Sequence, residues 1–168
     1  QVTWKPKDLQ VEGNVATTDR QVLQVLTEAS PTALGHRPLG AVVLGVNDYR
    51  RYYTESEMDD ALSTLQDYYR ARGYLDVAAT HEAVIDPGEE GRPGRGVRLK
   101  VGIAEGVRTH VDSLDVDLGV PVDEEQLALW RKQLVGQPFD PREQDRLERE
   151  ARALLSARGH LDQVVESR

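Results

Sequence analysis

The sequence predicts an α+β protein that contains the same small β-α-α-β-β unit twice. Two observations predict it: a helix-ending motif occurs twice, 86 positions apart, and the segments beside each motif change from helical to strand periodicity. A chain of 168 residues has room for one or two domains of ordinary size. We therefore expect one domain at residues 1–106 and a second at residues 107–168.

The repeat is clearest where the second helix of each copy should end. Residues 71–76 read ARGYLD and residues 157–162 read ARGHLD, so five of six positions agree. Gly73 and Gly159 stand where a residue in the left-handed conformation would end a helix at low cost. The motif therefore predicts a helix before each glycine and a strand after it.

The starts of these second helices are also marked. Thr54 with Glu57, and Asp140 with Glu143, have the spacing of a capping box, and Pro141 suits the first helical position. Apolar residues then recur at intervals of three and four: Met58, Ala61, Leu62, Leu65, Tyr68 and Tyr69 in the first copy, and Leu147, Ala151, Leu154 and Leu155 in the second.

In the first copy a β-hairpin should follow the second helix. Residues 75–85 alternate apolar and polar side chains until Pro87, with His81 as the one interruption of the apolar phase, and residues 97–103 alternate in the same way. The glycine-rich segment 87–96 between them predicts a long polar tip.

Each copy should begin with a strand and a first helix. Residues 8–14 and 113–119 share a Leu-x-Val pattern that predicts the strand. Helix-start signals follow at Thr18 with Gln21 and at Asp123 with Gln126.

The two copies differ in two places. The first carries about 19 extra residues within 31–52, including the apolar run 39–46, which is either an added strand or an exposed hydrophobic hook. The second stops before a counterpart of residues 97–103, so we interpret the chain, which begins at Gln1 without Met, as a mature or excised fragment. Exposed strand edges in the second copy should then favour strand-mediated self-association.

Composition excludes several classes of function. Twenty-nine acidic against 21 basic residues give a net charge of −8, which argues against binding nucleic acid. Without cysteine there is no disulfide, thiolate nucleophile or Cys-bearing zinc site, and the longest apolar run is too short to span a bilayer.

No catalytic or metal site stands out. The four histidines, at 36, 81, 110 and 160, lack the spacing that places two imidazoles on one helical face, and adjacent carboxylates such as Asp59 and Asp60 point to different faces. No serine lies in a G-x-S-x-G context. We expect no metal, no cofactor and no enzyme activity, although an acidic α+β hydrolase stays open as a less favoured alternative.

Taken in order, the motifs resemble tandem POTRA (polypeptide-transport-associated) domains of the BamA/TamA family of outer-membrane assembly factors. The resemblance rests on VEGN at residues 11–14, GQPF at 136–139, YRARGY at 69–74, LSARGH at 155–160 and VGIAEG at 101–106. It implies, for each copy, a three-stranded mixed sheet with two helices on one face, the units repeating head to tail before a membrane β-barrel. His160, the DLG at residues 117–119, the insertion and the missing last strand depart from the family pattern.

The resemblance also implies function: a periplasmic arm at the outer membrane of a Gram-negative bacterium that binds rather than catalyses. The partners would be unfolded outer-membrane proteins, periplasmic chaperones or assembly lipoproteins, and the chain's own C-terminal barrel. A docking scaffold of a division or two-partner secretion protein is an alternative.

An edge strand of such a sheet displays unpaired N–H and C=O groups that an extended polypeptide can complete, which is β-augmentation. We expect the strand at residues 75–85 and its counterpart at 161–165 to offer that edge, unless they are only the edges of a spacer arm. The candidate edge residues are Leu75, Asp76, Val77, Ala78, Ala79, Thr80, His81, Leu161, Gln163 and Val165. Candidate contacts to a partner or a lipid headgroup are Leu39, Val42, Leu44, Arg92 and Arg95.

Overall fold

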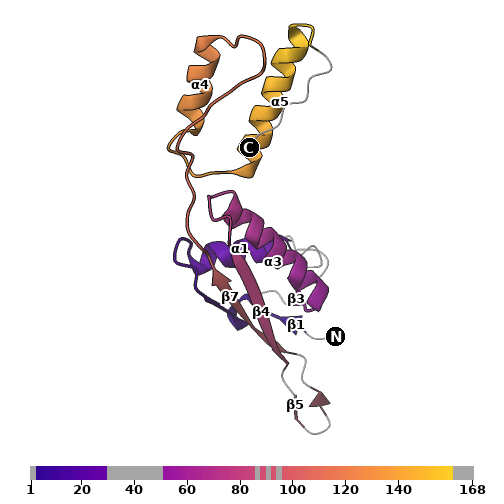
Figure 1. Cartoon of the computed structure of the whole chain (residues 1–168). Helices are drawn as coiled ribbons and strands as arrows, with labels where there is room; N and C mark the ends of the chain where they lie inside the picture. The colour runs from indigo at the N-terminus through magenta and orange to yellow at the C-terminus, as the bar shows by residue number, and fades with distance from the viewer. Residues whose placement is uncertain (1–2, 30–50, 86–87, 90–91, 94–95, 161–168) are drawn as a thin grey trace, which may run out of the picture. The chain divides into compact units, whose positions relative to one another are not determined.

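The structure, a computed structural model, describes residues 3–29, 51–85, 88–89, 92–93 and 96–160. Contacts divide the chain into two compact units: Gln1–Tyr68 with Asp76–Gly106, and Tyr69–Leu75 with Val107–Arg168. The described residues contain four helices and a three-stranded mixed sheet, which confirms the predicted α+β class. The two units are considered separately below (Figure 1).

The sheet of the first unit is built from β2 (Leu9–Glu12), β4 (Ala78–Ile85) and β7 (Val97–Ala104), in the order β2-β7-β4. β7 pairs in parallel with β2 and antiparallel with β4, so it is the central strand. The predicted hairpin is therefore present. Its tip contains the short pair β5 (Gly88–Glu89) and β6 (Arg92–Pro93).

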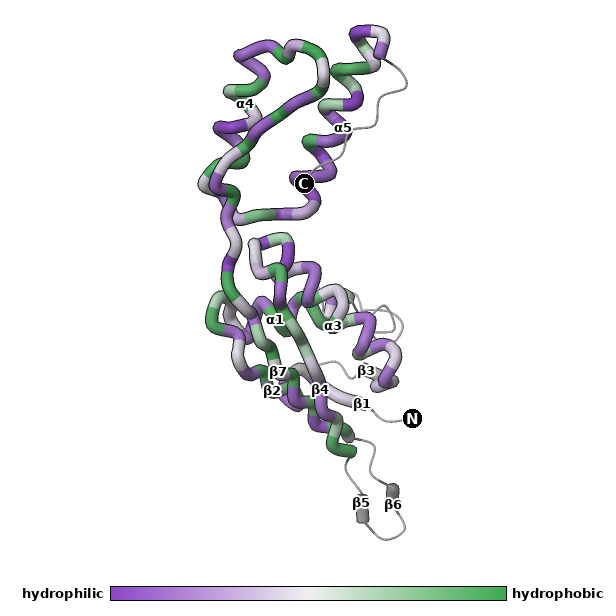
Figure 2. The backbone as a smooth tube through the Cα atoms, in the orientation of Figure 1, coloured by the Kyte–Doolittle hydropathy of each residue, from purple (hydrophilic) through white to green (hydrophobic). Residues whose placement is uncertain are grey.

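The core of this unit lies between β7 and two helices, α1 (Asp19–Ala29) and α3 (Glu55–Arg70). Every second residue of β7 is buried, which leaves the intervening residues on the opposite face of the sheet. The helices supply apolar side chains at intervals of three and four, and the alternation of hydrophilic and hydrophobic stretches along them is visible in Figure 2. The buried set is Val97, Leu99, Val101 and Ile103 with Val22, Leu26, Met58, Ala61, Leu62 and Leu65.

A second, two-stranded sheet pairs β1 (Thr3–Trp4) with β3 (Arg51–Tyr52). It was not predicted, because two residues are too few for a strand periodicity to register. It holds Trp4, only 2% exposed, in a cluster with Met58, Val97 and Leu99.

The helix-start signals are confirmed in the first unit. At α1 the Gln21 amide donates to Thr18 Oγ1 (3.3 Å) while the Thr18 amide donates to Gln21 Oε1 (2.9 Å), which is a reciprocal capping box. At α3 the Glu57 amide donates to Thr54 Oγ1 (3.3 Å). The caps satisfy donors that the first helical turn leaves unpaired.

The second unit contains α4 (Glu124–Leu134) and α5 (Pro141–Ala157). Asp123 and Asp140 are the N-cap residues, as expected, but neither forms the reciprocal box. Asp140 instead accepts from the Arg142 amide (2.9 Å), and Asp123 pairs with Arg158 Nη2 (2.9 Å).

The prediction of a strand at residues 113–119 is wrong. No strand is assigned to these residues, and no described strand pairs with them, although Arg131 Nε donates to Leu114 O (3.3 Å). A strand is defined by its ladder partner, and the segment expected to supply part of this sheet, 161–165, lies outside the described residues. Residues 109–111 and 136–139 are linked instead: the Val111 amide donates to Gln137 O (2.9 Å) and the Phe139 amide to Thr109 O (3.0 Å).

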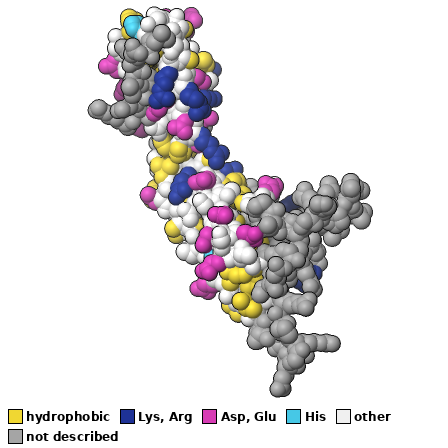
Figure 3. All heavy atoms as spheres, turned by 90° about the vertical axis from the view of Figure 1, so that its right-hand side faces the viewer, with side chains coloured by type: hydrophobic (Ala, Val, Ile, Leu, Met, Phe, Trp, Pro, Cys, Tyr) yellow, Lys and Arg dark blue, Asp and Glu magenta, His cyan; other side chains and the backbone are white. Residues whose placement is uncertain are grey.

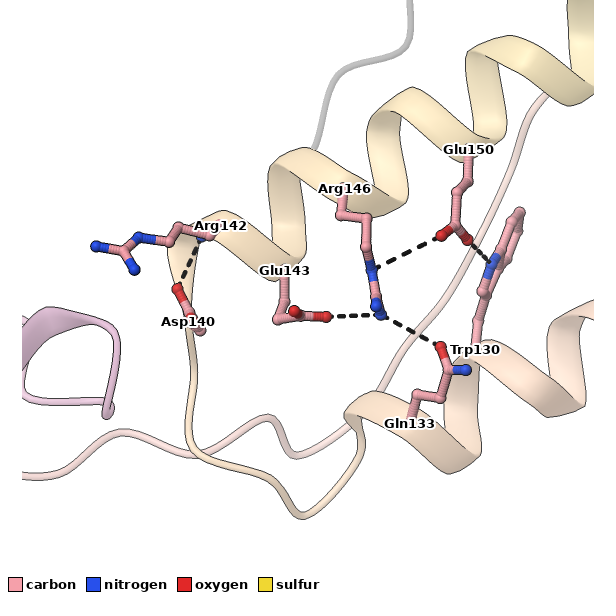
Figure 4. Close-up of polar contacts among 7 residues, drawn as sticks. All are labelled: Trp130, Gln133, Asp140, Arg142, Glu143, Arg146 and Glu150. Atoms are coloured by element: carbon pink, nitrogen blue, oxygen red, sulfur yellow. Dashed lines mark hydrogen bonds and ion pairs between the residues drawn. The ribbon is translucent and has the colours of Figure 1, made fainter.

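α4 and α5 are joined by a buried tryptophan and a polar network (Figure 4). Trp130, 2% exposed, donates its indole N–H to Glu150 Oε2 (2.8 Å). Arg146 extends the network to Glu143 (2.6 Å) and Gln133 (3.3 Å). The indole places a large apolar surface in the interior while its one donor is satisfied.

Candidate functional site

The candidate site is the outer edge of β4. β4 pairs with β7 on one side only, and among the described residues no strand pairs with its other side. Eight residues at about 3.3 Å each give an edge about 26 Å long, on which alternate residues direct N–H and C=O groups outward.

The predicted edge begins too early in the sequence. Leu75 and Asp76 lie in a turn, and Val77, 5% exposed, is buried before the strand starts at Ala78. The alternation of apolar residues continues through this turn, so periodicity alone placed the strand three residues too far toward the N-terminus. Ala78, Ala79, Thr80 and His81 do lie in β4.

The two faces of β4 differ. Ala79, His81 and Ala83 are partly buried and stand opposite the buried Ile103, Val101 and Leu99 of β7, so they face the helices. Ala78, Thr80 and Glu82 are exposed on the other face. Side chains of a strand added here would meet two small alanines and one imidazole on the helix side.

Among Ala79, His81 and Ala83, the residues of β4 that face the helices, His81 is the polar one. Burial raises the pKa of the Tyr53 phenol, and the Glu55 and Asp59 carboxylates raise it further, so the phenol keeps its proton. It can therefore donate to His81 Nε2 (3.2 Å), while Nδ1 lies 3.8 Å from Asp59 Oδ1 on α3. These contacts tie the middle of the edge strand to the preceding loop and to the helix.

The α3 side of β4 is acidic, whereas Lys100 and Arg98 of β7 stand opposite Glu82 and Val84 on the other face of the sheet. Asp59, Asp60 and Asp67 are exposed on α3, and Asp76 and Glu82 are exposed at and near β4. Figure 3, which views the molecule from the α3 side, shows acidic side chains gathered there. The edge thus combines main-chain groups that no described strand pairs with and, on the α3 side, a negatively charged surface.

Several candidate residues cannot be placed. Leu161, Gln163, Val165, Leu39, Val42, Leu44 and Arg95 lie outside the described residues. Arg92 belongs to β6, where only the backbone is described.

A comparison with protein families decides the relationship. The family model described as "POTRA: Surface antigen variable number repeat" matches residues 5–106, more than half of the chain. The chain belongs to the POTRA family. A search of curated proteins gave no match.

Solved POTRA structures resemble the fold. The BamA POTRA domains 3–5 of Haemophilus influenzae align with a TM-score of 0.50 and 16% identity, over 95% of this chain and 57% of that one. POTRA domains 1–2 of the periplasmic part of Omp85 from Anabaena align with a TM-score of 0.48 and 11% identity, over 99% of this chain and 84% of that one. The chain therefore spans little more than half the length of the BamA chain it resembles.

The described part of this POTRA chain contains no group of three or more His, Asp or Glu side chains that could hold a metal ion. None of its described helices is long and apolar enough to cross a bilayer.

Sequence reasoning missed two features near this edge. The Tyr53–His81 contact joins residues 28 positions apart, and no local spacing encodes it. The burial of Trp4, a residue of β1, was also missed, although a lone tryptophan before the first predicted strand was a usable signal.

Proposed function

We propose that this chain is part of the periplasmic arm of an Omp85-type factor for outer-membrane protein assembly or translocation, and that it binds extended polypeptide along β4. The observation that carries the proposal is the eight-residue outer edge of β4, with which no described strand pairs, within a domain of the POTRA family. An added strand would complete the outward N–H and C=O groups without regard to its side chains. That suits a partner class of unfolded outer-membrane proteins, chaperones or assembly lipoproteins, at the outer membrane of a Gram-negative bacterium.

The geometry favours binding over catalysis. A strand added at β4 would lie on an open edge, where Ala79 and Ala83 leave room and His81 is already bonded to Tyr53. Each main-chain hydrogen bond contributes only about 0.5–1.5 kcal/mol net, so short segments should bind weakly and reversibly. Weak binding lets the bound polypeptide be released, which a transport arm requires.

The test uses a ten-residue peptide of alternating Thr and Val and two N-methylated forms of it. One form carries methyl groups on every second residue, which leaves the N–H groups of one side of the strand free to pair with β4, and the other carries them on all ten residues, which leaves none. We expect the fully methylated form to bind the whole chain more than about tenfold more weakly, while the half-methylated form binds like the parent. Amide shifts of the ¹⁵N-labelled chain should map to β4.

The half-methylated form is the control, because it also carries backbone methyl groups but keeps one pairing side. Equal binding of both forms, or shifts that leave Ala78–Ile85 unchanged, would refute the proposal and favour the spacer role.

A further inference from the structure

The turn between β2 and α1 is tied to a residue that lies far away in the sequence. The Ala16 amide donates to both oxygens of the Glu105 carboxylate, at 2.9 Å to Oε1 and 3.0 Å to Oε2. β2 and β7 run parallel, so they end at the same end of the sheet, and Glu105 is the first residue after β7. One side chain therefore joins the two segments that leave this end of the sheet.

The backbones of these two segments come close enough for the contact. Gly13, the residue after β2, has a φ of 84°, and a Cβ there would lie 2.0 Å from Ile103 O near the end of β7. Only glycine tolerates that approach and that φ without strain. The turn therefore starts directly against β7, and the Glu105 side chain can reach Ala16.

Burial contributes little to holding the tip of the turn. Val15 is 92% exposed, and Ala16 is exposed as well. The neighbouring hydrogen bonds are local, from the Val15 amide to Gly13 O (3.1 Å) and from Asn14 Nδ2 to Thr17 O (3.1 Å). The Glu105 contact adds a distant anchor, and its carboxylate makes the hydrogen bond stronger than one between neutral groups.

The same contact restrains the segment on which Glu105 lies. Residues 105–109 continue the chain beyond β7, and Val107 among them is 79% exposed. The Thr109 amide donates to Gly73 O (2.8 Å), which holds the far end of this segment. Glu105 holds its near end.

We propose that Glu105 is a latch: its carboxylate keeps the turn at residues 13–17 closed on the end of β7, and opening of the contact releases both this turn and residues 106–108. Glu105 is thus a positioning residue for the chain that leaves the first unit. The inference goes beyond the binding proposed at β4, because neither that strand nor a bound polypeptide takes part in it.

The test measures amide hydrogen exchange and ¹⁵N relaxation of the whole chain, unaltered and with Glu105→Ala. In the unaltered chain the Ala16 amide should exchange slowly although Ala16 is exposed, because the amide is hydrogen-bonded. Glu105→Ala should speed this exchange about tenfold or more, as for a lost hydrogen bond to a charged group. It should also lower the heteronuclear NOE of residues 106–108, which reports their motion on the fast timescale.

Two further variants separate the latch from a general loss of structure. In Glu105→Gln the amide oxygen can still accept from Ala16, so exchange should rise less than in Glu105→Ala and residues 106–108 should stay ordered. Glu28→Ala is the matched control, because Glu28 is exposed on α1 and loses the same side chain and charge. It should leave both measurements unchanged.

Fast exchange of the Ala16 amide in the unaltered chain, or exchange that Glu105→Ala does not change, would overturn the inference. Loosening of the turn without loosening of residues 106–108 would overturn it too, because Glu105 would then support the turn alone. The same holds if Glu105→Gln or Glu28→Ala loosens both segments as much as Glu105→Ala does.

Discussion

Gly73 and Gly159 adopt the left-handed conformation, with φ of 92° and 86°, and each ends a helix in the same way. The Tyr74 and His160 amides donate five residues back, to Tyr69 O (3.2 Å) and Leu155 O (3.0 Å), in a Schellman arrangement. The sequence predicted both glycines because the conformation is a local property. It could not predict what surrounds each of them.

Those surroundings give a prediction at the residue scale. A Cβ at Gly73 would lie 2.5 Å from Thr109 O, whereas a Cβ at Gly159 would meet no atom of the described residues within 4 Å. Gly159→Ala should therefore cost only the left-handed penalty, about 1–2 kcal/mol, and Gly73→Ala should cost about 1–3 kcal/mol more because of the clash. Urea unfolding of both variants checks this, and equal losses would contradict the described crowding at Gly73.

His81 shows the limit of sequence reasoning at this scale. Its place as the polar interruption of an apolar alternation was evident, and it does lie in β4. Its partners, Tyr53 and Asp59, come from a loop and a helix that only the tertiary fold brings to it.

At the scale of elements, a helix or strand was predicted correctly where its own residues carry a periodic pattern or an end signal. α1, α3, α4 and α5 have apolar periodicity and end signals, and the β4–β7 hairpin has alternation on both arms. The segment 113–119 also alternates, yet no strand is described there, because a strand needs a neighbour as well as a pattern. β1 and β3 have a neighbour but no readable pattern.

The central position of β7 gives a prediction for the sheet. Val101 is fully buried and stands between Val11 and His81, whereas Val84 on β4 is 56% exposed. Val101→Ala should lower the free energy of unfolding by about 2–3 kcal/mol, and Val84→Ala by less than about 1 kcal/mol. Chemical denaturation measures both changes, and a similar loss for the two would mean that β7 is not the core strand.

At the scale of the molecule, the sequence predicted the family because the motifs of the POTRA unit occur in order along the chain, and the family match over residues 5–106 confirms it. The candidate site was predicted less well. The class of surface followed from a three-stranded sheet, which must have two edges, but the contacts of His81 with Tyr53 and Asp59 depend on how a loop and α3 pack beside β4. Side-chain packing of that kind has no signature in spacing.

The central claim is that a partner pairs with the main chain of β4, and amide hydrogen exchange measured with and without the Thr-Val peptide tests it most directly. In the free chain the outward N–H groups of β4 should exchange fast and those bonded to β7 slowly. Adding the peptide should slow exchange at every second residue of Ala78–Ile85 that was fast before. Protection that is absent from β4, or that covers its residues without this alternation, would contradict the account.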